Sequence, residues 1–245
     1  MSDFFSAEPG RIQLTEFGPL HWVTLGVLAL AIAVTVIFRA RLRSERVRWW
    51  LPVGLGIVAW ILEILYHVWT YINHLDFVFN LVPLELCAIS LYLTVILCFT
   101  RNRAVWEIYY FTSVGALASV LFPAMGGFGP DHIRYWHYFI CHGYIAWLNA
   151  WFLAVEGYRL RRSALVRLLA VGVPFVLVVR FVDWKWQVNY MFLQGPSATA
   201  SPLDFLGPAG PAYFLKLLLL AVVVFGIMYV AAPKVPRAPA LRDEA

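Results

Sequence analysis

The chain has 245 residues, of which 62% are hydrophobic and only 13% are charged, whereas an ordinary soluble domain is about 25% charged. This balance excludes a soluble globular protein, and a mean hydropathy of +0.73 excludes a disordered chain. The net charge of +5 is spread over short connecting segments instead of one basic face, so it does not indicate nucleic-acid binding, and an integral membrane protein remains.

Seven stretches of the chain are apolar enough to cross a bilayer, whose core of about 30 Å requires about 20 mostly apolar residues per helix. We therefore predict an all-α, polytopic membrane protein with a single domain of seven transmembrane helices over residues 1–245. In chain order the predicted spans are about 21–38, 51–71, 77–99, 104–125, 133–155, 164–184 and 212–232. The longest connection is the outer loop 185–211, and a loop of that length usually has a function.

The distribution of basic residues predicts the orientation of these spans. Fourteen of the 19 Lys and Arg residues lie after the first, third, fifth and seventh spans. The positive-inside rule then places the amino terminus outside and the carboxyl terminus in the cytoplasm, as an odd number of crossings requires. Because the first 20 residues lack a basic cluster, we expect no secretory signal peptide and a retained first span.

Polar side chains inside spans are costly and usually mark a pathway or an active site. Cys87 and His142 each lie roughly 15 Å from the outer end of their predicted helices, so we expect them to meet in one layer. Pro83 would bend the third helix, and its polar face would then line an interior pocket. The polar residues of the second, third and fifth spans are Glu63, His67, Asn80, Glu85, Cys87, His137, Cys141, His142 and Asn149.

Two interpretations of Cys87 and His142 stay open on these grounds. A thiol needs an imidazole neighbour to react well at neutral pH, so the pair fits a nucleophile and its base, with Cys141 as a weaker rival nucleophile. A free cysteine is also a common packing residue in apolar interiors. Glu63 and His67, four residues apart on one helical face, fit either a proton-carrying or base-orienting pair or a structural one.

A metal site requires three or four converging ligands, and the histidines do not provide them on one helix. His137 and His142 are five residues apart, which separates them by about 140° around the helix. Nucleotide-binding and serine-hydrolase motifs are absent from the sequence. The sequence therefore predicts neither a metal nor a cofactor.

These residues and their neighbours resemble the bacterial YwaF-like integral membrane family, which is related to the eukaryotic transmembrane-protein-164 family. The resemblance covers most of the chain and is most specific in the outer loop, which ends in Pro211 and Tyr213. The matching stretches are Pro-Leu-Glu-Leu-Cys at 83–87, Gly-Ala-Leu-Ala at 115–118, Leu-Phe-Pro at 121–123, His-Tyr-Phe-Ile-Cys-His-Gly at 137–143, Asn-Tyr-Met-Phe-Leu at 189–193 and Ser-Pro-Leu-Asp-Phe-Leu-Gly-Pro at 201–208.

For the eukaryotic relatives, the resemblance implies transfer of acyl chains between phospholipids through a membrane-embedded cysteine. Cys87 matches that position, and His142 is the histidine that we pair with it. The first hypothesis is therefore a cysteine-dependent phospholipid acyltransferase of the bacterial plasma (inner) membrane, whose partners are membrane lipids and not nucleic acids. Asn80, Asn189 or Tyr190 would supply oxyanion donors, and the outer loop would exclude water.

Two further hypotheses use the same polar layer. A small-solute or proton-coupled carrier would employ Glu63, His67, Glu85 and His142 as a relay, although seven spans do not fit a simple inverted duplication. A structural factor would use the polar layer only to hold helices together. The oligomeric state, the acyl chain and the headgroup stay open.

Overall fold

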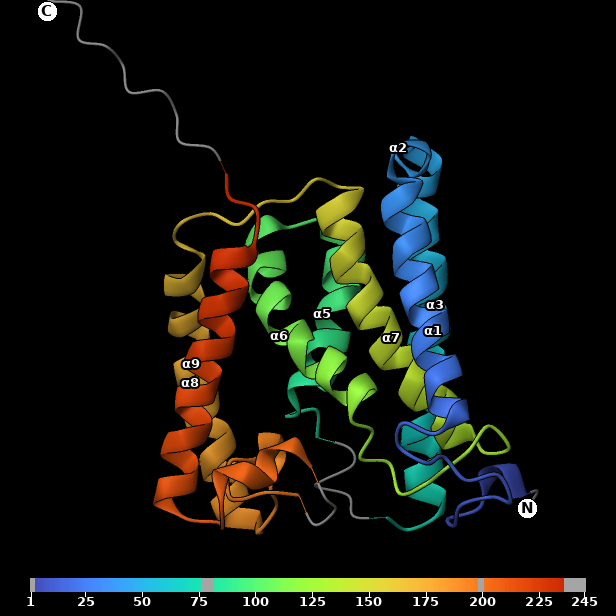
Figure 1. The fold of residues 1–245 in the computed structure, drawn as a ribbon, viewed down its shortest axis with the longest axis vertical. Helices are drawn as coiled ribbons and strands as arrows, with labels where there is room; N and C mark the ends of the chain where they lie inside the picture. The colour runs from blue at the N-terminus through green and yellow to red at the C-terminus, as the bar shows by residue number, and fades with distance from the viewer. Residues whose placement is uncertain (1–2, 76–81, 198–200, 236–245) are drawn as a thin grey trace, which may run out of the picture.

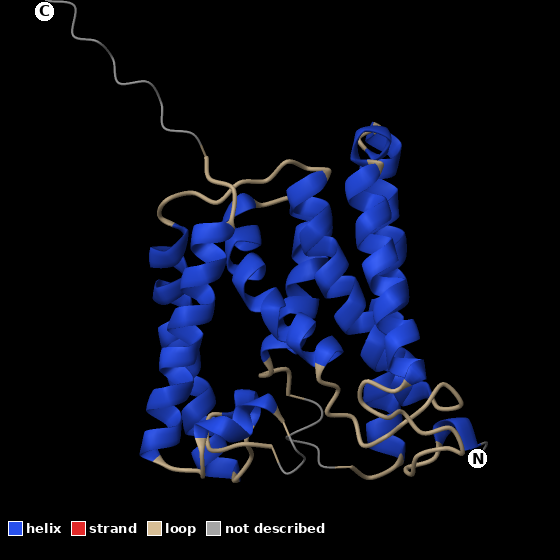
Figure 2. Cartoon of the chain, in the orientation of Figure 1, coloured by secondary structure: helices blue, strands red, loops and turns tan. Residues whose placement is uncertain are grey.

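The computed structural model describes residues 3–75, 82–197 and 201–235. Over these ranges the chain is helical, with two isolated β-bridges and no strand (Figure 2). The predicted all-α class is therefore confirmed for the described part of the chain. The α-helices are α1 (Pro19–Ile37), α2 (Arg39–Leu42), α3 (Glu45–Ile72), α5 (Leu86–Thr100), α6 (Arg103–Leu121), α7 (Ile133–Ala154), α8 (Ala164–Trp186) and α9 (Pro211–Ala231). Three short 3-10 helices are η1 (Asp3–Phe5), η2 (Tyr190–Phe192) and η3 (Pro202–Leu206).

The long helices run roughly along one direction, with α1 and α3 on one side, α8 and α9 on the other, and α5, α6 and α7 between them (Figure 1). The central helix is α7, which packs against α1, α3, α5 and α6. In this central position, 13 of its 22 residues are buried. By contrast α9, described over its whole length, buries only Tyr213 and turns its apolar surface outward.

Five helices are long and apolar enough to cross a membrane by length and composition, namely α1, α3, α6, α8 and α9. The apolar α5 has only 15 residues, and α7 has the length but a more polar sequence. A buried central helix does not need an apolar surface all round, because its polar face contacts other helices instead of lipid. The polar composition of α7 is therefore consistent with its central position.

The third predicted span is wrong at its beginning. We expected one helix over 77–99 with a bend at Pro83, but residues 82–85 are not helical and α5 begins at Leu86, while residues 77–81 lie outside the described part of the chain. Proline lacks an N–H donor and disfavours helix in the residue before it, so the helix starts after Pro83 instead of bending there. Asn80 lies outside the described residues. Likewise the predicted span 104–125 is too long, since α6 ends at Leu121, before Pro123.

Buried ion pairs hold together the end of the bundle where the basic segments meet. Glu107 of α6, whose side chain is fully buried, accepts hydrogen bonds from Arg161 Nε at 2.9 Å and Nη2 at 3.1 Å, and also from Arg167. Glu156 likewise pairs with Arg48 at 2.5 Å and with Arg101 at 3.0 Å. Glu107 and Glu156 each bind two arginines from segments distant in sequence. These ion pairs therefore fix the loops at this end of the bundle.

The amino-terminal segment packs across the opposite end of the bundle (Figure 1). The Ile12 amide donates to Asp131 Oδ2 at 3.0 Å, and His132 Nε2 lies 2.9 Å from the Ser6 carbonyl oxygen. Asp131 and His132 directly precede α7, and His132 is its N-cap residue. The segment is therefore tied to the beginning of the central helix.

Candidate functional site

A cavity of about 230 Å³ lies between α3, α7 and the beginning of α5. It is smaller than the roughly 300 to 1,000 Å³ of typical small-molecule sites, so it suits one reacting group rather than a whole lipid. Seven of the nine polar residues that we singled out in the second, third and fifth predicted spans line this cavity. Its lining residues are Glu63, Tyr66, His67, Val82, Pro83, Glu85, Cys87, Ala88, Leu91, Ser119, Ala124, Arg134, His137, Tyr138, Cys141, His142, Ile145 and Phe192.

Cys87 is the second residue of α5 and is half-buried at the edge of the cavity. The N-cap residue is Glu85, whose side chain does not cap the helix. The first amides of a helix have no helical acceptor, and among the described residues no oxygen atom accepts from the N–H groups of Leu86, Cys87 or Ala88. Uncommitted backbone donors therefore lie directly beside the sulfur.

His142 lies on α7 and is buried, and its Nδ1 is 2.6 Å from the carbonyl oxygen of Tyr138. A carbonyl only accepts hydrogen bonds, so Nδ1 carries the proton and Nε2 has a free lone pair. Within the described part of the chain, no residue hydrogen-bonds to Nε2 and no side chain hydrogen-bonds to the Cys87 sulfur. The base and the thiol thus line one cavity without a direct bond, as catalytic pairs often do before substrate binds.

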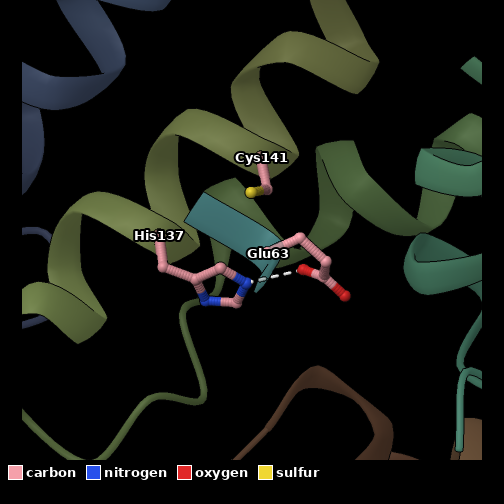
Figure 3. A group of neighbouring side chains, drawn as sticks. All are labelled: Glu63, His137 and Cys141. Atoms are coloured by element: carbon pink, nitrogen blue, oxygen red, sulfur yellow. Dashed lines mark hydrogen bonds and ion pairs between the residues drawn. The ribbon is translucent and has the colours of Figure 1, made fainter. Parts of the chain in front are cut away.

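A second polar group, on the wall formed by α3 and α7, is organised by a chain of hydrogen bonds. Arg134 Nη1 lies 3.3 Å from His137 Nδ1, and His137 Nε2 lies 2.8 Å from Glu63 Oε2. Arginine can only donate, so Nδ1 accepts, and Nε2 donates to the carboxylate (Figure 3). His67 Nε2 is a further 3.4 Å from Glu63 Oε1. Glu63 therefore orients His137 and contacts neither His142 nor Cys87.

Glu63, His137 and Cys141 offer three ligand atoms within 4.8 Å of one another (Figure 3). A metal would require a bare Nε2 and a thiolate. The contact with Arg134 keeps the proton on His137 Nε2, and the Cys141 thiol donates to the Ala59 carbonyl at 3.4 Å. The donor set is thus arranged as a hydrogen-bonded cluster and does not fit a metal.

The segment after α8 closes one side of the cavity through Phe192. Met191 and Phe192 have φ angles of +51° and +56°, which cost energy for residues other than glycine. The Met191 amide donates to Glu85 Oε2 at 3.1 Å, and the Tyr190 amide donates to Asp183 Oδ1 at 2.9 Å. These bonds hold a strained turn over the beginning of α5.

Asn189 and Tyr190 do not line the cavity. The Asn189 amide group donates to the Gly195 carbonyl at 3.0 Å and accepts from the Gln194 amide at 2.9 Å, so it is used within its own loop. Tyr190 is fully buried in a cluster with Val179 and Leu193. The donors closest to Cys87 are instead the amides at the beginning of α5.

A model of the TMEM164 family matches residues 16–229 of the chain, which include every residue that lines the cavity. The chain belongs to the TMEM164 family. No curated protein and no solved structure matches it. Membership of this family, together with the five long apolar helices, makes it a multi-pass membrane protein.

Sequence reasoning missed Arg134 as a cavity residue in this TMEM164-family protein. Arg134 lies outside the four basic segments from which we predicted the orientation, but it is the second residue of α7 and lines the cavity. Tyr66, one residue before His67, was missed as well. A usable signal was present in the spacing, because Arg134 lies three residues before His137 and so on the same helical face.

Proposed function

We propose that this protein is a phospholipid acyltransferase that works through a thioester on Cys87. It would cross the membrane seven times, with the amino terminus outside and the carboxyl terminus in the cytoplasm. The proposal places it in the bacterial inner membrane, in a YwaF-like branch of the family, with membrane lipids as its substrates. The observation that carries the proposal is that one cavity is lined by both Cys87 and His142, whose Nε2 has no hydrogen-bond partner among the described residues.

The proposed reaction has two halves. In the first, His142 Nε2 takes the proton of the Cys87 thiol, the sulfur attacks the ester carbonyl carbon of a phospholipid, and the carbon–oxygen ester bond breaks. The lysolipid alkoxide leaves with the proton from His142. In the second half, His142 takes the proton of an acceptor hydroxyl, the oxygen attacks the thioester, and the Cys87 sulfur leaves and regains its proton. The acyl group is conserved throughout.

The oxyanion formed in each half would be stabilised by the amides of Cys87 and Ala88, for which no oxygen acceptor is found among the described residues. A pre-aimed donor contributes roughly 3 kcal/mol in acyl-transfer enzymes. Phe192 and its strained turn would limit the access of water to the thioester, which favours transfer over hydrolysis.

Acyl exchange between a labelled phospholipid and a lysophospholipid, measured with purified protein in nanodiscs, tests this function. We expect Cys87→Ala to abolish exchange, and Cys141→Ala, which removes a neighbouring buried thiol, to retain it. His142→Gln should reduce the rate by about 10² to 10⁴, as loss of a general base does. Full exchange by the Cys87→Ala protein would refute the mechanism.

A second candidate function is a proton-coupled carrier, which is favoured by the chain of polar contacts from Arg134 through His137 and Glu63 to His67. Such chains carry protons in transporters. Proteoliposomes with an imposed pH gradient distinguish the two functions. Gradient-driven solute uptake that persists in Cys87→Ala protein would favour the carrier, whereas acyl exchange without uptake favours the enzyme.

A further inference from the structure

We infer that Arg134 binds the phosphate group of the lipid acyl donor, so that the cavity selects glycerophospholipids over neutral glycerolipids. The inference rests on the proposed function, because the same cavity holds Cys87 and His142. Arg134 is half-buried and lies at the beginning of α7, which is the outer end in the proposed orientation.

The guanidinium of Arg134 is held in place by aromatic rings. Its central carbon lies 4.6 Å from the ring centre of Tyr66 and 5.8 Å from that of Tyr138. Both tyrosines line the cavity as well. An arginine that is already fixed between rings loses little side-chain freedom when it binds an anion, and its planar fork matches the oxygens of a phosphate.

The guanidinium also has unused donors. One of its nitrogens, Nη1, faces His137 Nδ1, and no carboxylate of the described residues forms a salt bridge with it. The other guanidinium nitrogens are not fully buried, so their N–H groups are accessible to a ligand. An arginine near the membrane without a direct anionic partner marks a site for a substrate charge.

The two carboxylates of the cavity are already engaged by other donors. Glu63 accepts from His137 and contacts His67, and Glu85 accepts from the Met191 amide. Arg180 of α8 donates to the Leu193 carbonyl at 2.7 Å and lies over the Phe214 ring. Arg134 is thus the cation best placed to receive an anion in this cavity.

The order of groups along α7 matches the order of groups in a phospholipid. His142 lies eight residues after Arg134, which is about 12 Å further along the helix. A phosphate at Arg134 would therefore lie toward the headgroup side, and the ester would lie deeper, toward His142 and Cys87. The small cavity then needs to enclose only the phosphate and the ester region, with the acyl chains in the bilayer.

Binding measured without turnover tests this inference. The protein carries Cys87→Ala, and isothermal titration in detergent compares dioctanoylphosphatidylcholine with dioctanoylglycerol. We expect Arg134→Gln to weaken phosphatidylcholine binding by about 10- to 100-fold, the range for a charge-assisted hydrogen bond, and to leave dioctanoylglycerol binding unchanged. Arg134→Lys should give an intermediate loss, because it keeps the charge but not the fork. Lys185→Gln, which removes an exposed cation outside the cavity, is the matched control and should change neither affinity.

A third ligand, sn-glycerol 3-phosphate, separates a lipid phosphate from a free one. Equal affinity for this soluble ligand, with the same dependence on Arg134, would overturn the lipid assignment. Equal weakening of both glycerolipids by Arg134→Gln or by Arg134→Lys would also overturn it, since Arg134 would then act only on the shape of the cavity. If acyl exchange fails but phosphatidylcholine binding still requires Arg134, the inference stands and the proposed function falls.

Discussion

Replacement of Glu63 distinguishes a structural from a chemical role for the chain of polar side chains on α3 and α7. Its carboxylate accepts a 2.8 Å bond from His137 and makes a long 3.4 Å contact with His67, and the side chain is only 14% exposed. Glu63→Ala would leave the buried His137 Nε2–H without an acceptor, at a cost of about 2 to 3 kcal/mol. Glu63→Gln keeps an oxygen toward His137, so its cost should be only about 1 kcal/mol.

For a chain of this size, 1 kcal/mol lowers the melting temperature by about 2 to 4 °C. Thermal unfolding in detergent should therefore show a loss of about 4 to 12 °C for Glu63→Ala and about 2 to 4 °C for Glu63→Gln. Because Glu63 does not contact His142, Glu63→Gln should reduce acyl exchange by less than about tenfold, or about 1.4 kcal/mol of barrier. A folded Glu63→Gln protein that loses about a thousandfold in rate would refute this reasoning and give Glu63 a part in the chemistry.

Three further predictions concern the two ends of the bundle. Glu107→Gln should cost about 3 kcal/mol, since it leaves paired arginines without their buried carboxylate, whereas the exposed Glu45→Gln should leave the melting temperature unchanged. The Ile12 amide lowers the pKa of Asp131 below its ordinary value of 3.8, so this contact stabilises the protein above that value and is lost as the pH falls through the lowered pKa. The protection factor of the Ile12 amide against hydrogen exchange, taken relative to the intrinsic rate at each pH, should accordingly stay high at neutral pH and fall only in acid; an unprotected Ile12 amide at pH 7 would contradict it. Gly129→Ala would place its Cβ 1.8 Å from the Ile12 carbonyl oxygen and should release the amino-terminal segment to limited proteolysis, whereas an unchanged digestion pattern would show that the segment does not pack there.

Much of this organisation could be predicted from hydropathy and spacing. Runs of apolar residues located the ends of every long helix except α5 to within about six residues, because a span must cover about 20 residues to cross a bilayer. Cys87 and His142 do line one cavity, but the depth expected for Cys87 was wrong, because Cys87 is the second residue of α5 and does not lie roughly 15 Å inside a helix. The beginning of α5 was misplaced because we expected Pro83 to bend a continuous helix, whereas the helix begins only after this proline.

The pairing of the polar side chains could not be derived from one sequence. Glu63 and His67 are neighbours on one helix, yet the short hydrogen bond of Glu63 goes to His137, 74 residues away. Helical spacing indicates which side chains share a face, but rotation and packing of neighbouring helices decide which face meets which. For the same reason Arg134 was visible only as a charge near the membrane surface until α7 was placed against α3.

The most direct test of the account is mass spectrometry of the protein after incubation with phospholipid and without an acceptor. The account predicts a hydroxylamine-sensitive acyl adduct on the peptide that contains Cys87, absent from Cys87→Ala protein and retained in Cys141→Ala protein. On addition of a lysophospholipid, the adduct should disappear as labelled product forms. An acyl adduct on Cys141 alone, or product formation by the Cys87→Ala protein, would contradict the central claim.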